Sequence, residues 1–302
     1  MSGFASSLDA LIVMPTLKSS VLQASDKLKT DMFPARLHIL LASKAPLGLV
    51  FRRGPANAVC TVGWNRATDE FELGQWLRGR IYERRADLSP DGRHLIYFAR
   101  GGLRHQETKG SWTAISRAPW LHAVTLFGKG DCWQGGGLFT SNRKFWLNGC
   151  HFVVRESSEA TQDEQYKPAG FFGAECPSVY YRRLLRDGWA LDMAVGPGRV
   201  GHCTVFTKVL PHGWILRKFA YADVAHPVGA GVYWDEHELE HPERKALLSA
   251  PAWEWAERDG STLVWAEKGV LHRALLNPSG PVSAKVLYDF NPLRFEARKA
   301  PY

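Results

Sequence analysis

Asp91-Gly92-Arg93-His94-Leu95-Ile96-Tyr97 joins a tight turn to a short apolar strand, and the same pattern returns in Asp259-Gly260-Ser261-Thr262-Leu263-Val264-Trp265. The strand ends at Gly101-Gly102 in the first copy and at Gly269 in the second. An Asp-Gly pair next to a short apolar run is the typical sequence signal of a β-hairpin. The chain therefore repeats a hairpin unit.

The spacing of the two copies suggests how many units the chain holds. They lie about 168 residues apart, or four intervals of about 42 residues, and one four-stranded propeller blade takes about 40 to 50. Weaker copies lie near the required positions, at Leu47–Phe51, Gly137–Phe139 and His212–Leu216. Another is required near Gly170–Phe172. Asp187–Leu191 matches the pattern better but lies too close to Gly213 for a full blade, so we interpret it as an inner hairpin.

These observations predict an all-β fold, a β-propeller of about six blades, with five blades and a large insertion as the alternative. We assign residues 35–302 to this domain, because short apolar runs there alternate with Gly, Pro, Asn and Asp. Residues 1–34 are predicted to form a short helical N-terminal arm, since Ser6–Met32 carries apolar residues at helical spacing. Val286–Phe290 is expected to supply a closing strand that pairs near the start of the domain.

Leu88-Ser89-Pro90-Asp91-Gly92-Arg93-His94-Leu95-Ile96-Tyr97 resembles the repeat hairpin of WD-repeat-like and related bacterial β-propeller proteins. The resemblance is architectural and covers about two units well, and no blade ends in the Trp-Asp pair of a regular WD repeat. Proteins of this architecture act as scaffolds, ligand-binding proteins or enzymes, so the resemblance implies a fold and leaves the function open.

Composition narrows the cellular setting. The 302 residues are 45% hydrophobic and 23% charged, as in a soluble globular protein. The start has no secretory pattern and no stretch is apolar enough to span a bilayer, so we expect a cytoplasmic protein without membrane contact. The cysteines are odd in number and widely spaced, which favours buried or inert thiols over disulfides or a metal site: Cys60, Cys132, Cys150, Cys176 and Cys203. No cofactor is predicted.

The leading binding-site prediction is the segment Gln75–Arg85. Strand alternation would place on one face Trp76, Arg78, Arg80, Tyr82 and Arg84. Guanidinium groups bind phosphate or carboxylate, and Trp and Tyr stack on bases or sugars. Together with a net charge of +8, this face predicts a protein or an acidic macromolecule as partner, with nucleic acid as an alternative. The competing interpretation is an outer strand whose arginines are solvated or paired.

Two motifs match catalytic or cofactor signatures. His237, Glu238 and His241 have the spacing of a zinc-peptidase helix and are kept as an alternative metal site, with Asp235–Leu248 as a short helix. Pro242 would end that helix. Gly196–Gly201 fits a dinucleotide-binding glycine pattern, but a strand-like run follows, so we interpret it as a loop. Gly135–Gly137 is interpreted as a run that permits a bulge or a close approach between strands.

The primary functional hypothesis is a non-catalytic propeller scaffold. A hydrolase or lyase is the rival, with His and Asp or Glu from several blades meeting at the central channel, where His122, His202, His212 and His226 could converge. We assign no catalytic residue. A nucleic-acid-binding protein is the third hypothesis, because the basic aromatic face suits phosphates and bases.

Overall fold

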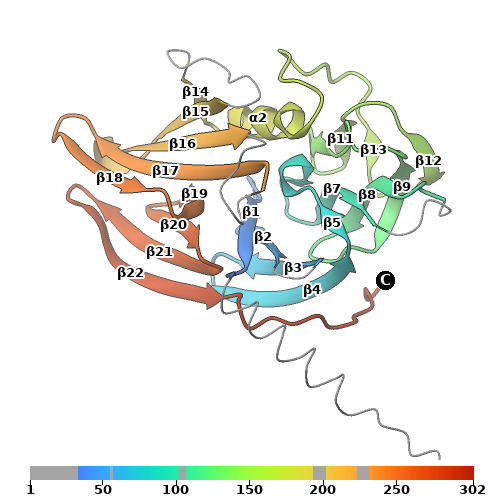
Figure 1. Cartoon of the computed structure of the whole chain (residues 1–302), viewed down its shortest axis with the longest axis horizontal. Coiled ribbons are helices and arrows are strands. Elements are labelled where there is room, and N and C mark those ends of the chain that lie inside the picture. Colours follow the sequence, from blue (N-terminus) through green and yellow to red (C-terminus); the bar gives the residue numbers. More distant parts are fainter. Residues whose placement is uncertain (1–32, 55–56, 102–106, 193–201, 223–230) are drawn as a thin grey trace, which may run out of the picture.

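The computed structural model describes residues 33–54, 57–101, 107–192, 202–222 and 231–302, which form five β-sheets and one α-helix (Figure 1). The predicted all-β class is confirmed. Apart from Phe33 and Pro34, the predicted helical arm lies outside the described residues. No helix in the described part of the chain is both long and apolar enough to cross a bilayer.

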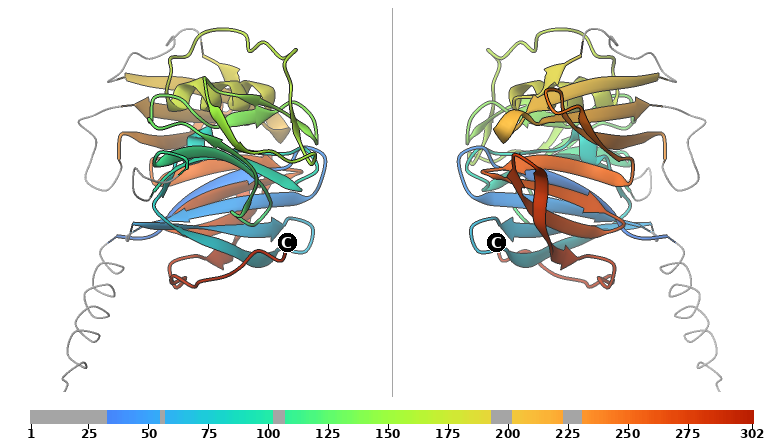
Figure 2. Two further views of the ribbon diagram at one scale, coloured as in Figure 1. Left: turned by 90° about the vertical axis from the view of Figure 1, so that its right-hand side faces the viewer. Right: turned by 90° about the vertical axis from the view of Figure 1, so that its left-hand side faces the viewer.

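The first and fifth sheets are regular antiparallel meanders of four strands each. The first contains β1 (Arg36–Leu41), β2 (Leu47–Arg53), β3 (Ala58–Asn65) and β4 (Glu70–Arg78). The fifth contains β19 (Trp253–Asp259), β20 (Thr262–Glu267), β21 (Val270–Asn277) and β22 (Gly280–Asp289). They lie side by side in both views of Figure 2, as the blue and red strands.

The second and third sheets are less regular and interleave in sequence. The second contains β5 (Arg80–Ile81), β6 (Asp87–Leu88), β7 (His94–Arg100), β8 (Ser111–Arg117), β9 (Ala123–Gly128) and β12 (Phe152–Arg155). The third contains β10 (Gly137–Phe139), β11 (Lys144–Leu147) and β13 (Thr161–Gln162), of which the last pairs in parallel.

Helix α2 (Cys176–Arg186) separates the third sheet from the fourth along the chain. The fourth sheet contains β14 (Ala190–Leu191), β15 (His202–Val209), β16 (Ile215–Ala222), β17 (Tyr233–His241) and β18 (Ala246–Ala250). Two 3₁₀ turns, at Glu83–Arg85 and Pro211–Gly213, complete the described elements.

Both Asp-Gly hairpins are confirmed. Asp91-Gly92 joins β6 to β7, and the Asp91 carboxylate accepts hydrogen bonds from the Ser89 hydroxyl (2.6 Å) and the Arg93 N–H (3.2 Å). Asp259-Gly260 joins β19 to β20. Gly92 (φ 75°) and Gly260 (φ 61°) adopt left-handed conformations, which glycine takes at least cost.

Four apolar clusters join neighbouring sheets. The first sheet packs on the fifth through Trp64, Trp255 and Phe290, and on the second through Phe51 and Tyr97. The second packs on the third through residues such as Ile96 and Phe145. Helix α2 and the fourth and fifth sheets share a further cluster that contains Tyr180, Trp189 and Trp265.

Three local predictions are corrected. The helix expected at Asp235–Leu248 is wrong, because β17 and β18 occupy it, and alternate β17 residues are buried. Asp187-Gly188 ends helix α2 before β14, where an inner hairpin was expected. Val286–Phe290 lies in and just beyond β22, which pairs with β21 and has no pairing near the start of the domain among the described strands. Phe290 reaches the first sheet by packing instead.

Glu254, on β19, joins the fifth sheet to the first, and we expect the strength of this contact to depend on pH. Its carboxylate accepts the Leu37 N–H (3.0 Å), and burial raises its pKa from 4.5 to about 7. Between these values the folded state binds more protons than the unfolded state, so stability falls as pH rises. Glu254→Gln should remove on the order of 2 kcal/mol of this decline. Urea denaturation at several pH values measures the free energy of unfolding of the wild type and of Glu254→Gln. Parallel pH profiles of this free energy for the two proteins would contradict the prediction.

Candidate functional site

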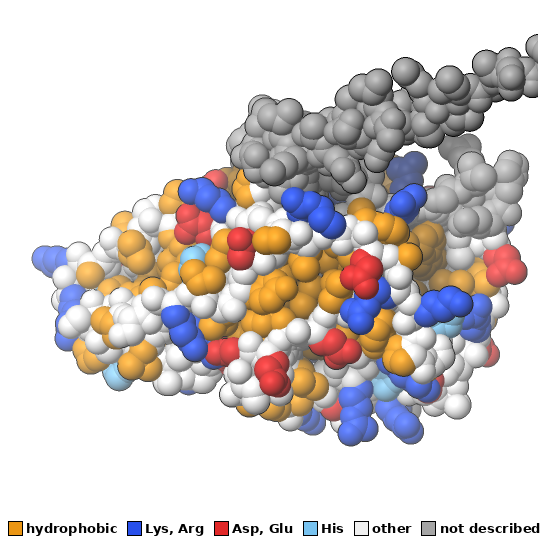
Figure 3. All heavy atoms as spheres, turned by 90° about the horizontal axis from the view of Figure 1, so that it is seen from below, with side chains coloured by type: hydrophobic (Ala, Val, Ile, Leu, Met, Phe, Trp, Pro, Cys, Tyr) orange, Lys and Arg blue, Asp and Glu red, His pale blue; other side chains and the backbone are white. Residues whose placement is uncertain are grey.

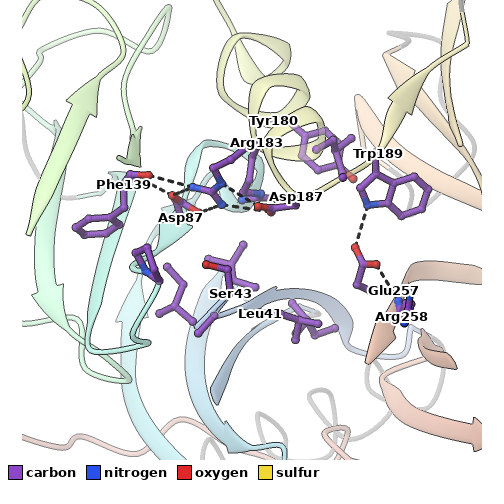
Figure 4. A pocket seen from close by; sticks show the side chains of 18 of the residues that line it. Leu41, Ser43, Asp87, Phe139, Tyr180, Arg183, Asp187, Trp189, Glu257 and Arg258 are labelled. Atoms are coloured by element: carbon purple, nitrogen blue, oxygen red, sulfur yellow. Dashed lines mark hydrogen bonds and ion pairs between the residues drawn. The ribbon is translucent and has the colours of Figure 1, made fainter. Parts of the chain in front are cut away.

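A cavity of about 710 Å³ opens where all five sheets approach helix α2 (Figure 4). Each sheet contributes to its wall: β1 from the first, β6 from the second, β10 from the third, β15 and β16 from the fourth, and β19 from the fifth. The turn after β1, helix α2 and the C-terminal turn of α2 complete the wall. Cavities of this size suit small ligands. Residues far apart in sequence therefore face one cavity that is open to solvent.

The cavity wall is basic. Its acidic residues are Asp87, Asp187 and Glu257, whereas its basic residues are Lys44, Arg66, Arg183, Arg186, Lys208, Lys218 and Arg258. Clefts lined mainly by one sign of charge attract ligands of the opposite sign. We therefore asked which of these cations are already neutralised by carboxylates.

One side of the wall is held by Arg186 at the end of α2. Its guanidinium donates to both carboxylate oxygens of Asp87 (2.5 and 2.9 Å) and to both of Asp187 (2.8 and 3.2 Å). Asp87 also accepts the N–H of Phe139 (2.7 Å). Burial raises the pKa of Asp187, whereas Arg186 acts in the opposite direction. This bidentate pair ties α2 to the second and third sheets.

On the opposite side, Glu257 neutralises Lys208. Glu257 accepts hydrogen bonds from the Trp189 indole N–H (2.9 Å) and the Lys208 ammonium (2.6 Å). The Trp189 ring faces two ammonium groups, that of Lys218 at 4.9 Å and that of Lys208 at 5.3 Å from its centroid. The aromatic face thus stabilises positive charge at this side of the wall.

Lys218 is the most deeply buried amine of the wall, with 1% of its surface exposed. Its Nζ lies 2.7 Å from Nε2 of His237 and 3.8 Å from a carboxylate oxygen of Asp235. The Nδ1 atom of His237 lies 2.6 Å from the Trp253 carbonyl, so Nδ1 carries the proton and Nε2 accepts from Lys218. Burial lowers the pKa of Lys218 to about 8 and that of His237 to about 3.

Asp235 is shared by several partners. It accepts a hydrogen bond from Arg84 (2.6 Å) and one from the Tyr180 hydroxyl (2.5 Å), besides facing Lys218. Its burial alone would raise its pKa, but Arg84 and Lys218 outweigh that effect and hold the pKa below its usual value. Asp235 is therefore a charged carboxylate between two cations.

Arg183 adds a third buried cation. It donates to the Ala86 carbonyl and to Nε2 of His38 (2.7 Å), and it forms no ion pair with a carboxylate in the described residues. Burial lowers the pKa of His38 well below its usual value, and Arg183, Arg84 and Lys218 lower it further. His38 is therefore neutral. We call Arg84, Arg183 and Lys218 the cation cluster; Asp235 is its one paired carboxylate among the described residues.

The predicted surface face does not form as one unit. Trp76 and Arg78 lie on β4 against Phe295 of the C-terminal segment, which runs below β4 in Figure 1. Gly79 interrupts the strand, so Arg80 lies in the second sheet over the Tyr82 ring. Arg84 is buried in the cation cluster. Seen from below in Figure 3, apolar side chains gather in the middle of this side of the molecule, with charged groups around them.

The alternative metal site lacks its helix. His237, Glu238 and His241 lie on strand β17, where four residues span about 13 Å, too far for two histidines to hold one ion. His241 packs edge-on against Trp214, and His237 binds Lys218. The described residues contain no cluster of three or more potential metal ligands.

The other motifs contribute nothing to the cavity where they fall in the described part of the chain. No histidine lines it within the described residues, and neither His122 nor His212 reaches it. Gly196–Gly201 and His226 lie outside the described residues, as does the side chain of His202. The five cysteines form no disulfide.

Sequence reasoning missed helix α2, which supplies Tyr180, Arg183 and Arg186. Pro177 in its first turn, basic residues in its last turn and Gly188 just beyond it are the signals that could have located it.

Comparison with known proteins does not identify the chain. No known protein family and no curated protein matches it. One solved structure with some likeness, at 1.18 Å resolution, is an uncharacterized protein of Listeria monocytogenes EGD-e, with 8% identity and a TM-score of 0.25. The match covers 84% of this chain and 66% of the other, so the chain spans just under two thirds of that protein. Such a likeness carries no conclusion on fold or function.

Proposed function

We propose that the protein binds a small anionic ligand, a carboxylate or a phosphate, in the cavity. The observation that carries the proposal is the cation cluster: Arg183 and Lys218 line the cavity, Lys218 shares the carboxylate of Asp235 with Arg84, and Arg183 pairs with no carboxylate among the described residues. Buried charge that lacks a counter-charge is costly, and an anion at the wall would offset that cost.

Two cations at the mouth of the cavity extend this argument. Lys44, after β1, and Arg258, on β19, are exposed and form no ion pair within the described residues. They would attract the anion before it reaches the buried cations. The paired cations Arg186 and Lys208 instead have carboxylate partners and serve to shape the wall.

The architecture that we propose around this cavity is an irregular five-bladed propeller. In support, the described residues form five sheets, each of which contributes to the cavity wall, and apolar clusters join neighbours. The third sheet is the smallest, and α2 stands beside it. Ligand sites at the centre of such a fold draw residues from several blades.

The scaffold and nucleic-acid functions stay predictions. The residues on which both depended do not share one face, since Arg84 is buried and pairs with Asp235, whereas Arg78 and Arg80 stay exposed in different sheets. The cavity, lined by residues of all five sheets, provides the better-formed site.

Removing the two mouth cations tests the anion-binding proposal. The double variant Lys44→Ala/Arg258→Ala should bind phosphate, citrate or pyruvate at least about tenfold more weakly than the wild type, which is about 1.4 kcal/mol. Isothermal titration calorimetry at low salt measures it, because screening weakens exposed charges.

The matched control is Arg244→Ala/Lys299→Ala, which removes two exposed charges that do not line the cavity. Equal affinities for both double variants would show that net charge alone attracts the anions. Absence of binding of every anion to the wild type would overturn the proposal.

A further inference from the structure

We propose that Lys218 forms an imine with a carbonyl group of the bound anion, which makes 2-oxo acids the ligand class of the cavity. This inference rests on the proposed anion-binding function and adds a covalent step to it. Nothing in the pattern around Lys218 in the sequence marks it; the evidence is its three-dimensional setting.

The first argument is the position of the amine. Lys218 projects from β16, the central strand of the fourth sheet, and lines the cavity although only 1% of its surface is exposed. Its Nζ is fixed by Nε2 of His237 at 2.7 Å and lies beside the Trp189 ring. An amine held in one orientation at a cavity wall can attack a bound carbonyl without first being ordered.

The second argument is the balance of charges around the amine. Asp235 and Glu257 favour the ammonium form, whereas burial, Arg84 and Lys208 oppose it, and His237 stays neutral. The net effect lowers the pKa of Lys218 to about 8, so a useful fraction is the nucleophilic free amine near neutral pH.

The step balances without a further reactant. The Lys218 nitrogen adds to the carbonyl carbon, the C–N bond forms, and the carbonyl oxygen leaves as water with two protons from the nitrogen. A protonated imine remains, so an ammonium and a carbonyl become an iminium and water with the total charge unchanged. Asp235 at 3.8 Å compensates that charge. Arg183 in the same wall is suited to bind the ligand carboxylate.

Lys208 provides a matched comparison within the same wall. Its ammonium also lies against the Trp189 ring. Unlike Lys218, it donates a hydrogen bond to Glu257 (2.6 Å), and no hydrogen bond to a histidine is found for it among the described residues. The Lys208 nitrogen is thus occupied by an ion pair. We therefore expect the imine at Lys218 and not at Lys208.

Reductive trapping tests the inference. The full-length wild-type protein is incubated with pyruvate and sodium cyanoborohydride, and the product is analysed by intact mass and peptide mapping. We expect one pyruvate-derived adduct, located on Lys218, in most molecules. Lys218→Arg should lose it and Lys208→Arg should keep it. Because mapping of the wild type locates the adduct, the test holds even if Lys218→Arg fails to fold.

Two probes and a binding measurement separate the possible failures. Propionate, an acid without the carbonyl group, should bind and give no adduct, whereas acetone, a carbonyl without the acid, should give an adduct at least about tenfold less efficiently. Pyruvate binding by calorimetry with no adduct at Lys218 would overturn the imine and leave the anion site standing. Absence of both binding and adduct would overturn the anion site as well.

Discussion

Asp235→Ala is expected to lower the free energy of unfolding by about 4 kcal/mol, the largest effect of any single substitution considered. The Asp235 carboxylate is 2% exposed and pairs with Arg84 at 2.6 Å. Its removal leaves Arg84 and Lys218 buried side by side without their shared counter-charge. Urea denaturation followed by circular dichroism measures the loss.

Glu240→Ala is the matched control for this prediction. Glu240 lies on the same strand β17 and pairs with Arg217 at 2.7 Å, but both side chains are about one-third exposed. Water and salt screen such a pair, so its loss should cost less than about 1 kcal/mol. Similar losses for Asp235→Ala and Glu240→Ala would contradict the assignment of Asp235 as the counter-charge of the cation cluster. Without Asp235 the cation cluster has more uncompensated positive charge, so an added anion should stabilise Asp235→Ala. An anion that stabilised Glu240→Ala but not Asp235→Ala would therefore also contradict the assignment.

Gly136→Ala should destabilise the protein by about 3 kcal/mol or more, for two separable reasons. Gly136 has φ 76°, where an L-residue is strained. A Cβ atom would also lie 1.9 Å from the carbonyl oxygen of Arg85, a backbone atom that cannot move aside easily. Thermal and urea denaturation of the variant measure the combined effect.

Gly110→Ala separates the two reasons. Gly110 also has a left-handed conformation, at φ 88°, but no atom lies within 4 Å of where its Cβ would be. Only backbone strain applies there, so the expected cost is about 1 kcal/mol. If Gly136→Ala were no more costly than Gly110→Ala, the close approach of Gly136, just before β10, to the Arg85 carbonyl would not be a rigid feature of the fold.

The sequence predicted that the Gly135–Gly137 run allows a close approach between backbones, but it did not show which backbone segments approach it. The run was expected to allow two backbones to approach, and Gly136 does approach the Arg85 carbonyl while Gly137 approaches that of Trp146. Glycine runs signal this need because they lack a Cβ atom. Which backbone arrives there depends on the packing of the second sheet against the third.

The predicted residues do not form one continuous face, for a physical reason that strand alternation cannot reveal. Period-two reasoning assumed one continuous strand from Trp76 to Arg84, but Gly79 breaks it between two sheets. Arg84 then lies in a 3₁₀ turn, where it reaches Asp235, 151 residues later in the chain. A strand break and a long-range ion pair together moved the residue from the surface to the core.

The sequence by itself determined the all-β class and the two Asp-Gly hairpins, because turn formation depends on residues that are neighbours in the chain. Only the tertiary structure decided the cavity and its charge. Lys218, Arg183 and Arg84 come from a strand, a helix and a turn in separate parts of the chain, and each alone would be an ordinary basic residue. Their shared burial, with Asp235 as the one carboxylate paired with them among the described residues, is the basis of the proposed anion site.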